Sequence, residues 1–272
     1  GASCWMKTTR SISWPSTCWH HQPSCSSWVA NEFSPQARKG LALAGLIGSA
    51  WLLSLGLSYT LPLDQTPGLL IGSLILLRAF LHTGLFIVAH DSMHASLVPG
   101  HPGLNRWIGK VYLLVYAGLS FERCYRNHRR HHLAPETFQD PDYQRCTNNN
   151  ILDWYVHFMG NYLGMRQLSN LSCLWLALII PNGSDLPAQI MHLLLFSVLP
   201  LIISSCQLFL VGTWLPHRRG ATTRPGVTTR SLALHPALSF AACYHFGYHR
   251  EHHESPSTPW FQLPQLRNES FT

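Results

Sequence analysis

Charged residues are scarce in this sequence. Of its 272 residues, 11% are Asp, Glu, Lys or Arg, whereas 46% are hydrophobic. A soluble globular domain carries about 25% charged residues, so this chain has too little polar surface to cover a water-soluble fold of its size. An intrinsically disordered chain is excluded too, because such chains combine high charge with few apolar residues. The composition therefore predicts a membrane protein.

Acidic residues are few, and two common motifs are absent from the sequence. The chain has 12 acidic against 19 basic residues, and the basic ones are scattered singly rather than gathered on a polar face, so we expect no nucleic-acid partner. The eight cysteines form no C-x-x-C pair, which argues against a zinc ribbon. No G-x-G-x-x-G motif follows a predicted strand, which argues against a dinucleotide-binding domain. Any electrons that the chain uses must then come from a separate protein.

Four apolar runs organise the chain, at residues 40–58, 68–89, 168–180 and 188–212. The third is short for a bilayer crossing, which takes about 20 residues, and Pro200 is expected to kink the fourth. We therefore expect an all-α integral membrane protein with about four transmembrane helices. Residues 1–39 contain no apolar run and are expected to form a poorly ordered N-terminal tail, followed by one domain over residues 40–272.

The distribution of basic residues predicts the orientation of these runs. Lys and Arg favour the cytoplasmic side, and none lies in the link 59–67. By contrast, Arg38 and Lys39 precede the first run, and Arg106 and Lys110 follow the second. Both ends of the first hairpin are therefore expected on the cytoplasmic side. The third and fourth runs are expected to cross as a pair, or the third to form a re-entrant hairpin.

Histidines are abundant and clustered. Eight of the 17 lie in three boxes, which read His90-Asp-Ser-Met-His94, His128-Arg-Arg-His131-His132 and His249-Arg-Glu-His252-His253. Positions i, i+3 and i+4 share one face of a helix, so each box presents its imidazoles in one direction. Imidazole binds Zn, Cu, Fe or Ni, and eight imidazoles exceed the four ligands of a structural zinc. We therefore predict a site for two metal ions in a helical cap beside the membrane. Lone histidines such as His82 are predicted to be ordinary core residues.

Several segments around these boxes resemble a known family. TGLFIVAHDSMHASL, HRRHHLAP followed by DPDY, GTWLPHR and CYHFGYHREHHESPSTPW are similar to signatures of the membrane di-iron oxygenases, and most closely to those of the β-carotene ketolases. The likeness is dense between about residues 83 and 264. Among the departures, Ala95 stands where the family leads us to expect Gly, and Glu136-Thr137 replaces a turn like Pro-Gly.

The resemblance implies a specific site and reaction. Two iron ions would activate O2, and a ferredoxin-like protein would supply electrons to a site on the cytoplasmic or stromal side. A carotenoid would enter from the lipid, and the C4 and C4′ methylenes of β-carotene would become ketones, giving echinenone and then canthaxanthin. The implied metal ligands are His90, His94, His128, His131, His132, His217, His249, His252 and His253.

The resemblance and metal chemistry also suggest supporting residues. His245 is expected to be a tenth ligand or to orient one. Asp91, Asp140 and Asp142 are expected to orient imidazoles rather than bind metal, although a simple turn is equally consistent with DPDY. Arg129 and Arg130 are expected on a solvated or donor-docking face. Three aromatic residues are expected either to line a polyene tunnel or to belong to an interfacial belt, namely Trp107, Tyr116 and Phe121.

Two alternatives stay open at this point. One is a different membrane di-iron enzyme, such as a fatty-acid desaturase or a carotene 3-hydroxylase. The other is a non-enzymatic membrane metal transporter or sensor. A transporter places its polar ligands near the middle of its spans, whereas these boxes lie at the ends of apolar runs.

Overall fold

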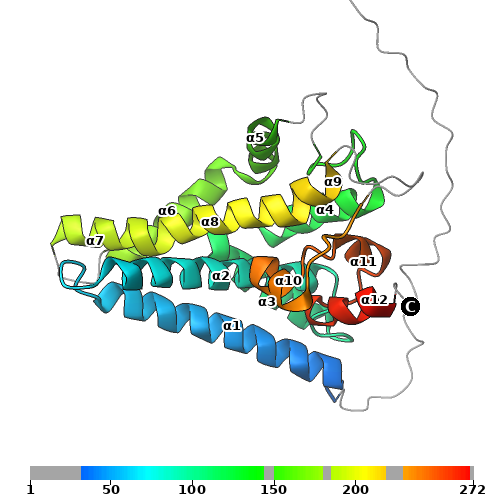
Figure 1. The fold of residues 1–272 in the computed structure, drawn as a ribbon, viewed down its shortest axis with the longest axis horizontal. Helices are drawn as coiled ribbons and strands as arrows, with labels where there is room; N and C mark the ends of the chain where they lie inside the picture. The colour runs from blue at the N-terminus through cyan, green and yellow to red at the C-terminus, as the bar shows by residue number, and fades with distance from the viewer. Residues whose placement is uncertain (1–31, 144–149, 180–184, 219–228, 270–272) are drawn as a thin grey trace, which may run out of the picture. The chain divides into compact units, whose positions relative to one another are not determined.

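The computed structural model describes residues 32–143, 150–179, 185–218 and 229–269. Most of the expected N-terminal tail lies outside these ranges. The first helix, α1 (Pro35–Thr60), starts earlier than expected and includes residues 35–39, which the sequence analysis assigned to the tail (Figure 1). Its start has a local cause. The Ser34 hydroxyl accepts a hydrogen bond from the Ala37 amide at 3.1 Å, and Pro35 fits the first turn because no intrahelical partner is lost there.

A second long apolar helix, α2 (Gly68–Met93), returns beside α1 and ends in the first histidine box. His82 joins the two helices, because its Nδ1 accepts a hydrogen bond from Trp51 Nε1 at 3.0 Å. The Nε2 of His82 lies 2.6 Å from the Tyr116 carbonyl oxygen. His82 is buried, so the prediction of an ordinary, hydrogen-bonded core histidine is confirmed.

Two shorter helices lead to the second box. The helix α3 (Pro102–Ala117) packs along α2, and Gly118 ends it in the left-handed conformation, with φ of 67°. The chain then reverses into α4 (Phe121–Leu133), which carries the second box. Gly109 allows this close approach, since a Cβ there would lie 2.3 Å from the Phe121 ring.

The apolar run after residue 188 belongs to a long helical segment with two π-helical stretches. It consists of α7 (Leu186–Leu193), η2 (Leu194–Val198), α8 (Leu199–Leu208), η3 (Phe209–Trp214) and α9 (Leu215–His217). The stretch η2 ends two residues before Pro200, which lies in the first turn of α8 and has no N–H to give to a carbonyl four residues earlier. That carbonyl, of Phe196, instead accepts a hydrogen bond from buried Arg78 on α2.

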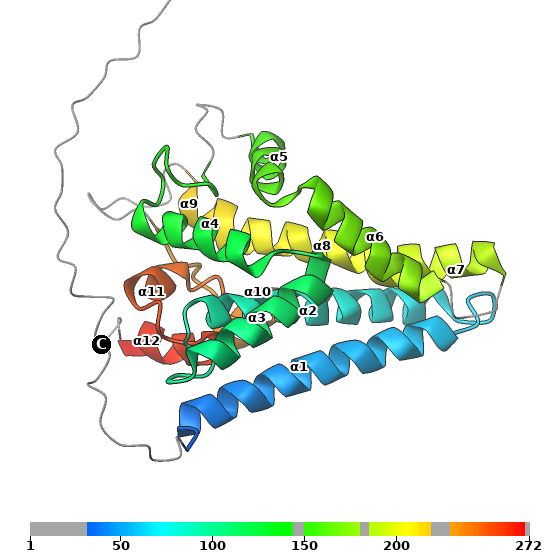
Figure 2. The ribbon, with the colours of Figure 1, turned by 180° about the vertical axis from the view of Figure 1, so that it is seen from behind.

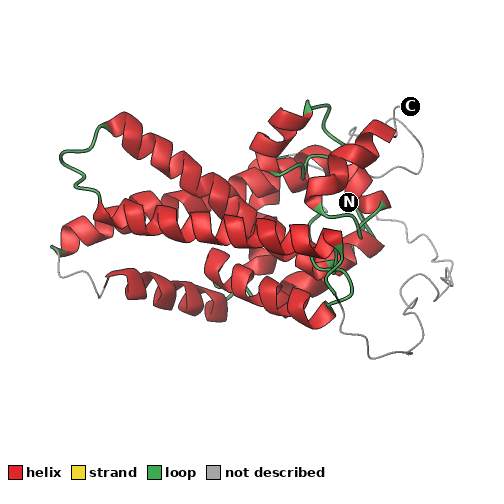
Figure 3. Cartoon of the chain, turned by 90° about the horizontal axis from the view of Figure 1, so that it is seen from below, coloured by secondary structure: helices red, strands yellow, loops and turns green. Residues whose placement is uncertain are grey.

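Three described helices are long and apolar enough to cross a membrane, namely Pro35–Thr60, Gly68–Met93 and Leu186–His217. The remaining predicted crossing, at 168–180, corresponds to α6 (Met165–Ile179), whose 15 residues fall short of the usual length. It follows α5 (Ile151–Tyr162). Within the described ranges every regular element is helical (Figure 3), so the all-α prediction is confirmed for them.

The ends of distant helices meet at one side of this bundle. The box-bearing ends of α2 and α4, the helix α9 and the helix α11 (His249–Glu254) lie together, away from the α1–α2 link (Figures 1 and 2). The cap around them also contains α10 (Pro236–Cys243), η4 (Trp260–Gln262) and α12 (Leu263–Glu269). The fold thereby brings the three histidine boxes into one region.

Candidate metal centre

The first box lies on the last turn of α2. His90 faces inward, and His94 caps the helix one turn later, so their ring centroids are 4.9 Å apart. Ala95 ends the helix in the left-handed region, with φ of 54°. This is the position where the resemblance led us to expect Gly, and the conformation explains that expectation because Gly adopts it without strain.

The second and third boxes lie on two short polar helices. On α4, the donor atoms of His128 and His132 lie beside those of the first box, and that of His131 lies beside those of His217, His249 and His253. Arg129 and Arg130 are exposed on the same helix. On α11, the buried Glu251 fixes the helix from the side, because Arg267 donates to its carboxylate at 3.0 Å. Ser231 also donates a hydrogen bond to this carboxylate.

All nine histidines that the sequence analysis proposed as ligands come together, in two groups. One group has five donors within 4.8 Å of one another and consists of His90, His94, His128, His132 and His252. The other has four within the same limit and consists of His131, His217, His249 and His253. No segment supplies either group alone, so the centre depends on the tertiary fold.

The donor atoms face one another in a way that fits bound metal ions. Nε2 atoms lie 2.7 Å apart in the pair His94–His128 and 2.8 Å apart in the pair His217–His249. Nitrogens that bind one ion at about 2.1 Å and at right angles are about 3.0 Å apart. The Nε2 of His90 is buried without a hydrogen-bond partner among the described residues, as fits a nitrogen that binds a metal ion. The residues therefore fit two metal ions held by imidazole.

Carboxylates hold three of these rings by their other nitrogen. Asp91 lies 3.2 Å from His90 Nδ1 and also accepts the Trp260 amide at 2.8 Å. Asp140 lies 3.0 Å from His131 Nδ1. Both aspartates were proposed for this role, which fixes the tautomer and orientation of a ligating imidazole.

Glu136 is the third carboxylate, and the sequence analysis missed it. Its Oε1 lies 3.3 Å from His217 Nδ1. The residue adopts a left-handed conformation, with φ of 59°, at the turn that departs from the family pattern. That departure was the one available signal, because 81 residues separate Glu136 from His217.

Two other proposed supporting residues have different partners. The Asp142 carboxylate accepts a hydrogen bond from the Tyr162 hydroxyl at 2.7 Å, and none of its described hydrogen bonds involves an imidazole. His245 belongs to neither histidine group, because its ring stacks on Tyr248, with centroids 5.6 Å apart. His245 is buried among aromatic rings and adopts a left-handed conformation, with φ of 63°.

The protonation of the proposed ligands outside the long apolar helices suits metal binding at all of them but His131. Burial lowers the pKa of His94 to about 4, and burial with neighbouring imidazoles holds the pKa of His252 well below its ordinary value. These rings are therefore neutral at pH 7, the form that binds metal. Burial also acts to lower the pKa of His131, but the hydrogen bond and charge of Asp140 outweigh it and raise this pKa.

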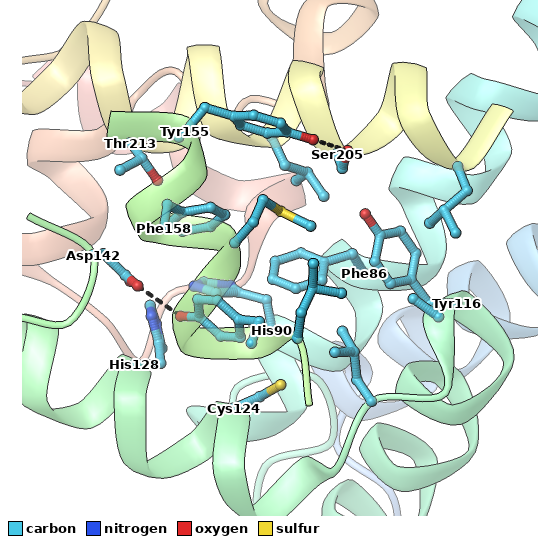
Figure 4. Close-up of a pocket in the computed structure, with 18 of the residues that line it drawn as sticks. Phe86, His90, Tyr116, Cys124, His128, Asp142, Tyr155, Phe158, Ser205 and Thr213 are labelled. Carbon is cyan, nitrogen blue, oxygen red and sulfur yellow. Dashed lines mark hydrogen bonds between the residues drawn. The ribbon is translucent and has the colours of Figure 1, made fainter. Parts of the chain in front are cut away.

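A cavity of about 220 Å³ adjoins the histidines (Figure 4). His90, His128, His131 and His249 contribute to its wall, and most of the other lining side chains are apolar or aromatic, including Phe86 and Phe158. Of the three aromatic residues proposed for a tunnel, Tyr116 lines this cavity. Trp107 is 62% exposed, and Phe121 packs against Gly109. The centre thus opens onto an apolar space.

Comparison with known proteins agrees with this architecture. The family model described as "Fatty acid desaturase" matches residues 66–179 and 166–271. A β-carotene ketolase of Paracoccus sp. (strain N81106 / MBIC 01143) is 37% identical over 85% of this chain and 93% of its own length. A β-carotene ketolase of Haematococcus lacustris is 30% identical over 91% of this chain and 87% of its own length. A zeaxanthin 4-ketolase of Chlamydomonas reinhardtii is 35% identical over 69% of this chain and 42% of its own length. The chain therefore belongs to the fatty acid desaturase family and, within it, to the β-carotene ketolases.

Proposed function

We propose that this chain oxidises the C4 and C4′ methylenes of β-carotene to ketones, using O2, and yields echinenone and then canthaxanthin. The observation that carries the proposal is the pair of histidine groups on the wall of an apolar cavity. An apolar cavity suits a hydrocarbon ring, and the relatives act, by their names, on carotenoids. All residues proposed for the reaction lie within the domain expected over residues 40–272.

Two iron ions are the proposed cofactor, one in each histidine group, with all nine histidines as ligands. When bound, iron supplies the activation of O2 and the oxidising power for an unactivated C–H bond, which side chains lack. The chain itself holds and orients the ligands through Asp91, Asp140 and Glu136. Its apolar cavity wall excludes water from the reacting carbon.

The carotenoid is proposed to enter from the lipid. Leu163 and Ile202 both line the cavity, and they are 41% and 50% exposed, so the cavity reaches an apolar outer surface. The electron donor is proposed to be a ferredoxin-like acidic protein. Arg126, Arg129 and Arg130 are exposed on α4, the helix that carries the second box, and opposite charge speeds the encounter of two proteins.

Four crossings, with the metal centre on the cytoplasmic or stromal side, are the proposed topology. The clustering of the box-bearing helix ends supports one common side for the boxes. A reporter fused after Thr272 is expected on the cytoplasmic side, and one inserted near Gln65 on the opposite side. Both reporters on one side would contradict this topology.

Expression in a bacterium that accumulates β-carotene tests the function. Echinenone and canthaxanthin should appear, with oxygen derived from O2 and two irons per purified chain. His131→Ala and His252→Ala should abolish both products while the protein stays in the membrane, because each removes a proposed ligand. Zeaxanthin as the main product would instead indicate a 3-hydroxylase, and altered fatty-acid unsaturation a desaturase. Unchanged pigment with zinc or no metal would support a metal-binding protein without this activity.

A further inference from the structure

A hydrogen-bonded polar pair lines the cavity near the metal centre. The Tyr162 hydroxyl of α5 donates to the Asp142 carboxylate at 2.7 Å, and both side chains contribute to the cavity wall. Figure 4 shows this contact as the dashed line that leaves Asp142, with His128 labelled nearby. Asp142 is only 7% exposed, so its carboxylate is a buried acceptor in mostly apolar surroundings.

The position of Asp142 is fixed by its backbone rather than by a histidine. Its amide donates to Asp140 at 2.9 Å, and its carbonyl oxygen accepts the Trp154 indole N–H at 2.8 Å. Donor atoms of His131, Asp140 and Asp142 all lie within 4.8 Å of one another. The carboxylate is therefore held close to His131 of the second histidine group, yet none of the hydrogen bonds among the described residues joins it to an imidazole.

The proposed reaction creates a need for such an acceptor, and the inference rests on that proposed function. The first oxidation uses O2, two electrons from the donor protein and two protons; one oxygen atom enters a C4–H bond to give an alcohol, and the other leaves as water. The second repeats this on the same carbon and gives a geminal diol, which loses water to become the ketone. Between the two steps, the alcohol must stay in the cavity, and a hydroxyl group in an apolar site is unfavourable without a hydrogen bond.

We propose that Asp142, positioned by Tyr162, accepts a hydrogen bond from the C4 hydroxyl and so retains the alcohol for the second oxidation. An ionised carboxylate offers about four lone-pair sites, so Asp142 can accept from the alcohol without losing Tyr162. The pair thereby determines whether the enzyme releases an alcohol or a ketone. Asp142 contacts the substrate in this role, and Tyr162 acts through Asp142.

The same cavity offers a matched control. Tyr155 lies two turns before Tyr162 on α5, and its hydroxyl lies 2.7 Å from Ser205 Oγ. Figure 4 shows Tyr155 and Ser205 facing each other, apart from Asp142 and His128. This second pair has the same tyrosine chemistry but no carboxylate. Removing it changes the polarity of the cavity without removing the proposed acceptor.

The test compares two double variants in cells that accumulate β-carotene. Asp142→Leu with Tyr162→Phe removes the proposed acceptor, and replacing both partners by apolar groups avoids leaving one of them buried and unpaired. Tyr155→Phe with Ser205→Ala is the control. We expect the first variant to raise the ratio of 4-hydroxylated to 4-keto carotenoid by about tenfold or more, as fits the loss of a hydrogen bond to a charged group. The control should keep the wild-type ratio, whatever its rate.

Two further readouts separate this role from a structural one. Iron per chain should equal that of the wild type in both double variants. Without reductant, purified Asp142→Leu/Tyr162→Phe protein should retain less 4-hydroxy-β-carotene than the wild type does, but as much β-carotene. If that double variant loses its iron, the single variant Tyr162→Phe tests the role of Asp142 instead. We then expect a smaller rise in the ratio of 4-hydroxylated to 4-keto carotenoid.

The outcomes also distinguish this inference from the proposed function. A wild-type chain that forms no ketone overturns the function. A wild-type chain that forms ketone, together with an unchanged ratio in Asp142→Leu/Tyr162→Phe and in Tyr162→Phe, overturns the role of Asp142. An equal rise in the alcohol ratio for the Tyr155→Phe/Ser205→Ala control also overturns it, because general cavity polarity would then be the cause.

Discussion

Gly212 in η3 allows Phe246 to pack between the bundle and the metal centre. A Cβ added to Gly212 would lie 2.5 Å from two atoms of the Phe246 ring. The ring cannot easily retreat, because it is 7% exposed and its centroid lies 4.7 Å from that of His90 and 5.9 Å from that of His252. Gly212→Ala should therefore push the ring against two proposed ligands.

The size of this effect follows from two opposing terms. Overpacking a filled core destabilises by about 1–3 kcal/mol. The better helix propensity of Ala returns up to about 1 kcal/mol. The middle of these two ranges gives a net loss of about 1.5 kcal/mol, which corresponds to a fall in Tm of about 3–6 °C for a domain of this size. Because His90 and His252 must move, we also expect fewer metal ions per purified chain.

Thermal unfolding of the detergent-solubilised protein and its metal content measure both effects. Gly45→Ala is the control, because a Cβ there meets no atom of the described residues within 4 Å, and this variant should keep its metal and unfold no earlier than the wild type. Adding Phe246→Leu to Gly212→Ala should restore part of the lost metal, since Leu leaves room for the new methyl group. A Gly212→Ala protein with wild-type Tm and metal content would refute the argument that Phe246 transmits the clash.

Three further substitutions test features outside the ligand set. His82→Ala leaves the Trp51 indole and the Tyr116 carbonyl without their partner, which costs about 1–3 kcal/mol for each unsatisfied group. Tm should therefore fall while the metal content stays the same, and an unchanged Tm would contradict this argument. Ala95→Gly should stabilise the protein by about 0.5–1 kcal/mol in denaturant unfolding, because Ala95 has a positive φ, and a loss would argue against strain there. Burial lowers the pKa of His245 to about 4, whereas an unfolded histidine titrates at about 6.5. Between these two pH values the unfolded chain binds a proton that the folded chain does not bind. The free energy of unfolding therefore falls as the pH drops through this window. His245→Asn, which tolerates the left-handed backbone, should flatten Tm against pH there, and an unaltered slope would assign the acid sensitivity to other groups.

The clustering of the eight box histidines could be predicted from the sequence because the signal within each box is local, whereas His217 was expected only from the family resemblance. Within each box the spacing alone places the imidazoles on one face of a helix, whatever the rest of the fold does. The start of α1 is also predictable from the sequence, since Ser34 before Pro35 is a helix-start signal. Hydropathy alone places this boundary five residues too late, at Gly40.

The partners of buried polar groups could not be predicted in the same way. Glu136 and His217 meet only because α4 and the long segment ending in α9 converge. Tyr162 lies 20 residues from Asp142, and a contact at that separation depends on how α5 packs. The sequence shows which side chains can form hydrogen bonds, but the tertiary packing decides which partner each of them has.

The pairing of Arg78 has a consequence for how the protein is made. A charged residue near the middle of an apolar helix opposes membrane insertion by about 2.5–3.5 kcal/mol. The earlier helix α1 already offers Arg78 the Ser54 hydroxyl, at 3.1 Å, and the Trp51 carbonyl. The Phe196 carbonyl is synthesised 118 residues later. The α1–α2 hairpin can therefore enter the bilayer as one unit with its arginine partly solvated by α1, and it completes that solvation only when the helix containing Pro200 arrives.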